Sequence, residues 1–165
     1  MMTEKYVVFS DVHGRSDLVR TLMARHRDAD AFFFLGDGLR DLPDGEPNLF
    51  SVRGNCDFSL DPTTPEEWML NLGGKKILLM HGHRLSVKSG LDRAIRYTSE
   101  RGADALLYGH THLPIENYYA EGSELYDGYR LPRALWVFNP GSLAAGDFGL
   151  LQIRRGQMLF SHGII

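Results

Sequence analysis

The chain repeats one pattern five times: a short apolar run ends in a polar loop that contains glycine. The segments are KYVVFSDVHG, AFFFLGDG, NLFSVRGNCD, KILLMHGH and ALLYGHTH. Runs of four to six residues rich in branched and aromatic side chains are typical of buried strands. The segment between the first two runs has apolar residues at helical spacing, with Leu18, Leu22 and Met23 on one face. Strand, helix and strand in this order predict an α/β fold with parallel strands.

The later part of the chain has a different character. Residues 66–83 read as a hairpin around Gly73 and Gly74, and residues 89–102 read as a second helix that Gly102 closes. After His112 we expect four strands joined by turns, with no helix, at residues 114–121, 133–142, 148–155 and 157–163. The predicted fold class is α/β, a two-sheet β-sandwich flanked by helices.

Composition narrows the class of protein. A chain of 165 residues suits one domain, residues 1–165, and can bury ~70% of its unfolded surface without a metal or a disulfide. The formal net charge of −3 argues against general nucleic-acid or membrane-surface binding. The single cysteine fits a reducing compartment, and no apolar run approaches the length of a membrane span. We therefore expect a cytoplasmic protein.

The loops that end the apolar runs carry residue types that bind metals. Ligand sites in parallel α/β sheets collect at the carboxyl ends of strands, so we expect these loops to meet. Seven such ligands exceed the needs of one ion but suit two divalent ions ~3.5–4 Å apart, with Asp37 as the bridging carboxylate. Imidazole and carboxylate without thiolate fit manganese, iron, cobalt, nickel or zinc. The candidates are Asp11, His13, Asp37, Asn55, His81, His110 and His112.

The spacing of His110 and His112 suggests how the two rings are presented. In an extended backbone, residues i and i+2 point to the same side, with Cα atoms ~6.5 Å apart. We expect the two histidines to project together on that basis. A hydrogen-bonded polar turn is the alternative for such a pair.

Taken together, these motifs resemble the calcineurin-like metallophosphoesterase superfamily from Asp11 to Ser142. The N-P-G-S segment at residues 139–142 is similar to its small YfcE-like phosphodiesterase branch. The resemblance implies a two-sheet sandwich and two metal ions, with manganese expected first. It implies Asp37 as the ligand common to both ions. It also implies two separate sets of ligands: Asp11, His13 and His112 for one ion, and Asn55, His81 and His110 for the other.

One position departs from the wider superfamily pattern. Many members carry a histidine after the asparagine, where it contacts the phosphate, and this chain has Cys56 there. The departure leaves the acid–base assignment open, and Cys56 can equally be a small residue packed beside the site. Our catalytic candidates are Asp37, Asn55 and Cys56.

Two classes of function fit the resemblance. The first is a phosphodiesterase that hydrolyses small phosphodiesters through a hydroxide bridging two metal ions, with a phosphomonoesterase as a variant. The second is a non-catalytic metal-binding scaffold, like the retromer subunit with this fold. A scaffold is free to lose ligands, and here every ligand position holds a competent residue, which favours the enzyme. A homo-oligomer is compatible with either class.

Several residues keep more than one interpretation. His83 either supports the ligands or faces the substrate, and Arg53 either contacts phosphate or packs. Asp57 is expected to orient its loop, while His26 and His162 are expected at the surface. Residues 116–132 form a lid, a subunit contact or only a loop.

Overall fold

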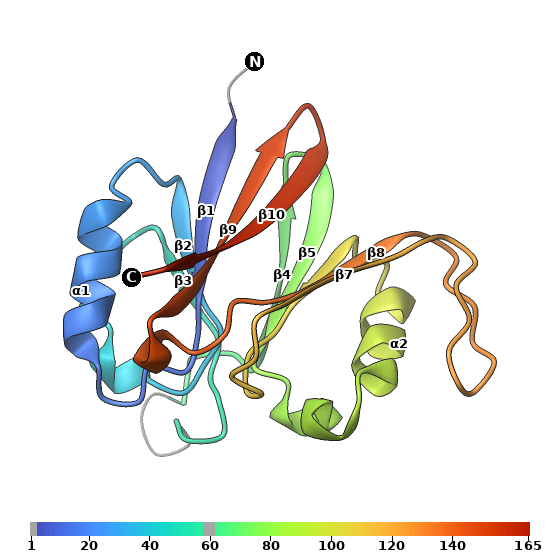
Figure 1. Ribbon diagram of the computed structural model, residues 1–165, viewed down its shortest axis with the longest axis horizontal. Coiled ribbons are helices and arrows are strands. Elements are labelled where there is room, and N and C mark those ends of the chain that lie inside the picture. Colours follow the sequence, from blue (N-terminus) through green and yellow to red (C-terminus); the bar gives the residue numbers. More distant parts are fainter. Residues whose placement is uncertain (1–2, 58–61) are drawn as a thin grey trace.

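The computed structural model describes residues 3–57 and 62–165, which form two five-stranded sheets packed face to face (Figure 1). In spatial order, the first sheet contains β10 (Gln157–Ile164), β9 (Asp147–Arg154), β1 (Glu4–Phe9), β2 (Ala31–Phe34) and β3 (Leu49–Ser51). The second contains β4 (Glu67–Leu72), β5 (Lys75–Met80), β6 (Ala105–Leu107), β8 (Leu135–Asn139) and β7 (Ile115–Tyr119).

Each sheet combines three parallel strands with antiparallel neighbours. β1, β2 and β3 pair in parallel, with Val7 opposite Phe32, while β9 pairs antiparallel with β1 and β10 pairs antiparallel with β9. In the second sheet β5, β6 and β8 are parallel, and β4 and β7 are antiparallel edge strands. Parallel strands release their chains at the same end of a sheet, so the loops after β1, β2, β5 and β6 are brought into one region.

One helix covers the outer face of each sheet (Figure 1). α1 (Ser16–Arg25) buries Val19 and Leu22 in a cluster with phenylalanines of β2, and α2 (Asp92–Glu100) buries Ile95 in a cluster with leucines of β5 and β6. Gly102 follows α2 with φ of +73°, the left-handed conformation that closes helices.

The inner faces of the two sheets form the central core. Val8 and Phe33 from the first sheet pack with Leu79, Leu107 and Phe138 from the second, and all five are fully buried. At about 1.5–3 kcal/mol for each large apolar side chain, this cluster is a major source of stability that does not involve the polar loops.

The predicted fold class is confirmed, with local differences. A single 3₁₀ turn, Leu143–Ala145, lies in the region expected to have no helix, because the chain turns sharply after the N-P-G-S segment. Part of the 116–132 segment belongs to β7, and its remainder is anchored by buried Leu125 and Leu131 in the cluster beneath α2. No helix in the described ranges is long and apolar enough to cross a membrane.

Candidate metal centre

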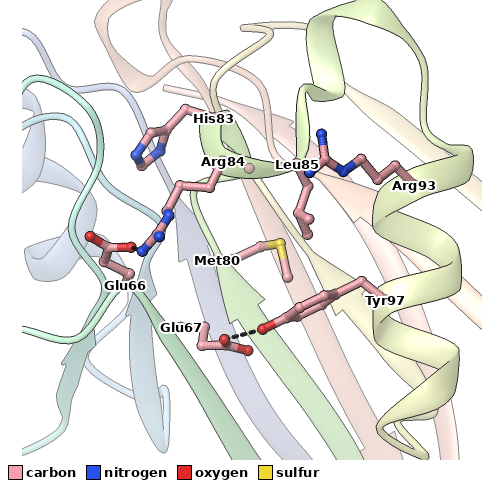
Figure 2. Close-up of a pocket in the computed structure, with 9 residues that line it drawn as sticks. Glu66, Glu67, Met80, His83, Arg84, Leu85, Arg93 and Tyr97 are labelled. Carbon is pink, nitrogen blue, oxygen red and sulfur yellow. Dashed lines mark hydrogen bonds and ion pairs between the residues drawn. The ribbon is translucent and has the colours of Figure 1, made fainter.

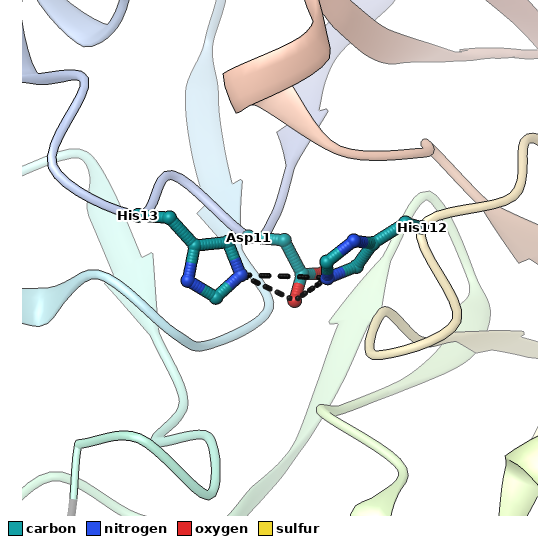
Figure 3. Close-up of side chains that lie close together, drawn as sticks. All are labelled: Asp11, His13 and His112. Atoms are coloured by element: carbon teal, nitrogen blue, oxygen red, sulfur yellow. Dashed lines mark hydrogen bonds and ion pairs between the residues drawn. The ribbon is translucent and has the colours of Figure 1, made fainter.

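The first group of candidate ligands joins the loop after β1 to the loop after β6 (Figure 3). Oδ1 of fully buried Asp11 lies 3.1 Å from Nε2 of His112 and 3.5 Å from Nε2 of His13. The two histidine Nε2 atoms are 3.4 Å apart. Three ligand atoms therefore converge on one point, with a buried carboxylate behind and two partly exposed imidazoles in front.

The second group combines the loops after β2, β5 and β6. Nε2 of His81 lies 3.2 Å from Oδ2 of Asp37 and 3.1 Å from Nδ1 of His110. Asp37 and His81 are buried, whereas His110 is half-buried. The Nδ1–H of His81 donates to the carbonyl of Leu35 at 2.8 Å, which leaves Nε2 free to face the other two ligands.

The two groups adjoin each other. Nε2 of His81, in the second group, is 3.9 Å from Oδ1 of Asp11 in the first. The backbone N–H of His110 donates to Oδ2 of Asp11 at 3.0 Å, and the Ser10 hydroxyl donates to the same oxygen at 2.6 Å. Asp11 is thus held by the loop that carries the ligands of both groups.

Backbone strain is concentrated at these residues. Positive φ is uncommon outside glycine and costs about 1–3 kcal/mol where the surrounding structure enforces it. Five candidate ligands adopt it: Asp11 (56°), His13 (45°), Asp37 (65°), His110 (70°) and His112 (64°). Aspartate and histidine tolerate this conformation better than most residues, which fits their use here.

The extended backbone expected around His110 and His112 was therefore wrong. Both residues have left-handed φ, so the rings are separated by a tight turn and not by strand alternation. The His110 ring contacts His81 in the second group, and the His112 ring contacts Asp11 in the first group.

Asn55 and Cys56 are exposed at the turn that follows β3. The Cys56 N–H donates to Oδ1 of Asp37 at 2.8 Å, which ties this turn to the second group. The Asn55 amide lies 3.5 Å from the Cys56 sulfur. Burial and the negative charge of Asp37 raise the pKa of the Cys56 thiol.

Asp57 fixes the geometry of this turn and of the Asp37 loop. Its carboxylate is buried and accepts four backbone hydrogen bonds. Oδ2 accepts from Asp37 (2.7 Å) and Gly54 (2.8 Å), while Oδ1 accepts from Gly38 (2.9 Å) and Leu39 (3.2 Å). The expected orienting role is confirmed.

Residues of the N-P-G-S segment form a wall behind the ligands. The buried Asn139 amide donates to the carbonyl of Gly109 and to the Thr111 hydroxyl, and the Ser142 hydroxyl donates to the Asp11 carbonyl at 2.8 Å. Sequence reasoning recognised the segment as a turn but missed these bonds and the role of Ser10. The sequence did contain a signal for these contacts, because Ser10 directly precedes a ligand motif and the N-P-G-S segment has polar side chains at both ends.

In the second group, charge interactions and burial shift the pKa values of Asp37 and His81 in opposite directions. Burial alone would raise the pKa of Asp37, but hydrogen bonding and charge attraction from His81 outweigh it and lower that pKa strongly. The pKa of His81 is raised because Asp37 and Asp11 outweigh its burial. Burial, followed by the charges of His81 and Lys88, lowers the pKa of His110 to about 4. A neutral His110 is the form that can bind a metal ion.

The remaining candidates lie outside the two groups. The Arg53 guanidinium donates to the carbonyl of Asp57 at 2.8 Å, in agreement with a packing role. The His83 ring lies 5.4 Å from that of His81. His162 is exposed as expected, and His26 is half-buried with a fully buried Nδ1.

A family model described as the calcineurin-like phosphoesterase superfamily domain matches residues 5–155. The chain belongs to this superfamily. Calcineurin-like phosphoesterases depend on metal ions, and the carboxylate and imidazole donors of both groups are types that divalent transition metals accept. The residues present therefore fit the group that the superfamily implies.

Relatives of this calcineurin-like chain include phosphoesterases of bacteria. It is 33% identical to the probable metallophosphoesterase YsnB of Bacillus subtilis over 83% of this chain and 73% of that protein. It is 28% identical to the phosphodiesterase YfcE of Escherichia coli K12, in a match that spans 58% of this chain and only 45% of YfcE. A conserved protein of Streptococcus pneumoniae TIGR4, described as a predicted phosphoesterase, superposes with a TM-score of 0.77 at 25% identity, covering 99% of this chain and 91% of that one.

The same fold occurs in vacuolar protein sorting 29. The structure of that protein from Cryptosporidium parvum superposes with a TM-score of 0.67 at 17% identity, covering 100% of this chain and 99% of the other. This similarity is one of fold alone.

Proposed function

We propose that the protein is a phosphodiesterase that uses two divalent transition-metal ions, with manganese as the first candidate. One observation carries the proposal: two three-residue ligand groups adjoin through His81, whose Nε2 lies 3.2 Å from Asp37 and 3.9 Å from Asp11. A pair of adjacent dications supplies an activated water and polarises phosphoryl oxygens in ester hydrolysis.

The chain's own residues divide this work. Asp11, His13 and His112 would hold one ion, His81, His110 and Asn55 would hold the other, and Asp37 would be shared by both. Asp11 and Asp37 bring negative charge that keeps the ions in place, while exposed His13 and His112 leave the substrate side open. The Asp57 carboxylate holds the Asp37 backbone, and the Cys56 N–H donates to Oδ1 of Asp37, so the carboxylate that would be shared is held at both its ends.

The residue after Asn55 favours diesters over monoesters. A histidine at this position can carry a positive charge toward a dianionic monoester and a proton toward the leaving group. The Cys56 thiol carries no positive charge in either protonation state, so it cannot take over this role. A singly charged diester depends less on a positive charge at this position than a dianionic monoester does.

Hydrolysis of two nitrophenyl esters tests the proposal. We expect a higher kcat/KM for bis(4-nitrophenyl) phosphate than for 4-nitrophenyl phosphate at matched pH and metal concentration. Cys56→His should narrow the gap by improving the monoester, whereas Cys56→Ser, as the matched control, should leave the preference in place. A native protein that is clearly faster on the monoester would replace the phosphodiesterase proposal with a phosphomonoesterase.

A non-catalytic scaffold is the second candidate, favoured by the shared fold with vacuolar protein sorting 29. Retention of every candidate ligand in this chain supports the enzyme instead. Failure to hydrolyse any mono- or diester with manganese, nickel, cobalt, magnesium or zinc would support the scaffold. The single cysteine supports a reducing compartment such as the cytoplasm as the site of action.

A further inference from the structure

A pocket of about 380 Å³ opens between β4, the turn after β5 and α2 (Figure 2). Pockets of ~300–1,000 Å³ are typical of small-molecule sites. None of the seven proposed metal ligands lines it, so it is a separate feature from the metal centre.

The pocket begins one side chain away from the second ligand group. His83 lines it, and the His83 ring lies 5.4 Å from the His81 ring and 6.1 Å from the His110 ring, centroid to centroid. A substrate phosphate at the ion that His81 and His110 would hold would therefore lie near the mouth of the pocket. One ester arm leaves in the displacement and the other stays on phosphorus, and a pocket beside the ion site can hold the arm that stays.

One wall of the pocket is apolar and partly aromatic, formed by Met80 at the end of β5, Leu85 in the following turn and the ring of Tyr97 on α2. Apart from Gly82, the other lining residues are charged or polar: Glu66, Glu67, His83, Arg84 and Arg93. The Tyr97 ring is held from two directions, because its hydroxyl donates to Glu67 and the Arg101 guanidinium lies 3.2 Å from its centroid. A fixed aromatic ring beside a thioether suits a flat aromatic ligand.

An arginine without a partner stands at the rim. Arg93 lies one helical turn before Tyr97, so both side chains leave the same face of α2. Within residues 3–57 and 62–165, the Arg93 guanidinium makes no hydrogen bond or ion pair, whereas Arg84 is paired with Glu66. Its donors are therefore available to carbonyl groups of a ligand in the pocket.

We propose that this pocket binds the retained nucleoside arm of the diester, an inference that rests on the proposed phosphodiesterase function. The base lies against Met80, Leu85 and the Tyr97 ring, and Arg93 donates hydrogen bonds to its carbonyl oxygens. An apolar wall with a polar rim matches a nucleobase, which has an apolar face and a polar edge. A long acyl chain would leave the charged rim without partners.

Two diesters with the same leaving group test the proposal. We expect thymidine 5′-(4-nitrophenyl phosphate) to have a kcat/KM about tenfold or more above that of methyl 4-nitrophenyl phosphate, as base stacking on an aromatic side chain predicts. Tyr97→Ala should remove most of this advantage and leave the methyl diester within about twofold of native. Tyr118→Ala, an exposed tyrosine on β7 outside the pocket, should keep the advantage.

A second variant protects the test against loss of folding. Arg93 is exposed, so Arg93→Ala should fold normally and reduce the thymidine advantage through KM, while exposed Arg20→Ala on α1 should not. Equal kcat/KM values for the two diesters in the native protein, or equal losses on both diesters in Tyr97→Ala and Arg93→Ala, would overturn the nucleoside pocket alone. No hydrolysis of either diester would overturn the phosphodiesterase proposal together with it.

Discussion

At the scale of single residues, the centre depends on groups that touch no substrate. Asp57 is the clearest example, because one buried carboxylate accepts hydrogen bonds from both the Asp37 loop and the turn that carries Asn55. Two segments separated by about twenty residues therefore share one anchor. In the motif G-N-C-D, the last residue, Asp57, holds the turn that carries Asn55 and Cys56.

We predict that Asp57→Ala destabilises the fold by about 3 kcal/mol or more, since four backbone N–H groups, two buried and two partly buried, lose their acceptor. Asp57→Asn should lose less, because its remaining carbonyl oxygen can still accept. Urea unfolding of the two variants checks this order, with exposed Asp44→Ala as the control. Equal stability of Asp57→Ala and Asp44→Ala would contradict the anchoring role.

The pKa of His110 predicts acid sensitivity of the chelated protein. This pKa is lowered to about 4, below the ordinary value of 6.5, so the unfolded chain binds a proton on His110 that the folded chain does not. The free energy of unfolding should therefore fall as the pH drops from about 6.5 to 4. The raised pKa of His81 acts only above this window, because both states are protonated below 6.5.

His110→Gln should flatten that dependence in denaturant titrations of the chelated protein. His26 and His83 also have lowered pKa values through burial, so part of the slope should remain. If the free energy of unfolding depended on pH identically in the native and variant proteins, His110 would not be held neutral in the folded state.

At the scale of elements, the strands and both helices follow from local sequence. The apolar runs predicted β1, β2, β5 and β6, and Gly102 predicted the end of α2, because periodicity and left-handed glycines act within a few residues. Sequence also predicted which loops carry ligands. It did not reveal the left-handed backbone of His110 and His112, because tertiary contacts to Asp11 and His81 impose that conformation.

Close packing of the strand ends also lay beyond sequence reasoning. Gly109 ends the apolar run of β6, and a Cβ added there would lie 2.1 Å from Oγ of Ser10 and 2.9 Å from Oδ2 of Asp11. The loops after β1 and β6 approach this closely only because one of them has no side chain. The glycines of the repeated pattern are therefore part of the centre.

We predict that Gly109→Ala lowers the free energy of unfolding by about 1–3 kcal/mol, as overpacking does, and weakens metal uptake by displacing Asp11. Gly45→Ala is the control for metal uptake, because it also loses stability through its φ of +71° but nothing lies within 4 Å of a Cβ there. Thermal unfolding and metal titration of both variants measure the difference. Normal metal uptake by Gly109→Ala would contradict the close approach.

At the scale of the whole molecule, folding and metal binding are separable. Three apolar clusters hold the sheets and helices together, and the candidate ligands belong to none of them. The protein should therefore keep its secondary structure after chelation and accept metal again. Bound metal should raise the thermal midpoint, because it stabilises the native state alone.

The metal content of the reloaded protein tests the central claim most directly. After chelation, incubation with manganese and removal of free ions, elemental analysis of the native chain should approach two equivalents as diesterase activity saturates. Asp37→Ala should bind less metal and lose activity, since Asp37 is the proposed shared ligand, while exposed Asp44→Ala should match the native chain. A fully active native protein that saturates at one equivalent would contradict the account of two adjoining ion sites.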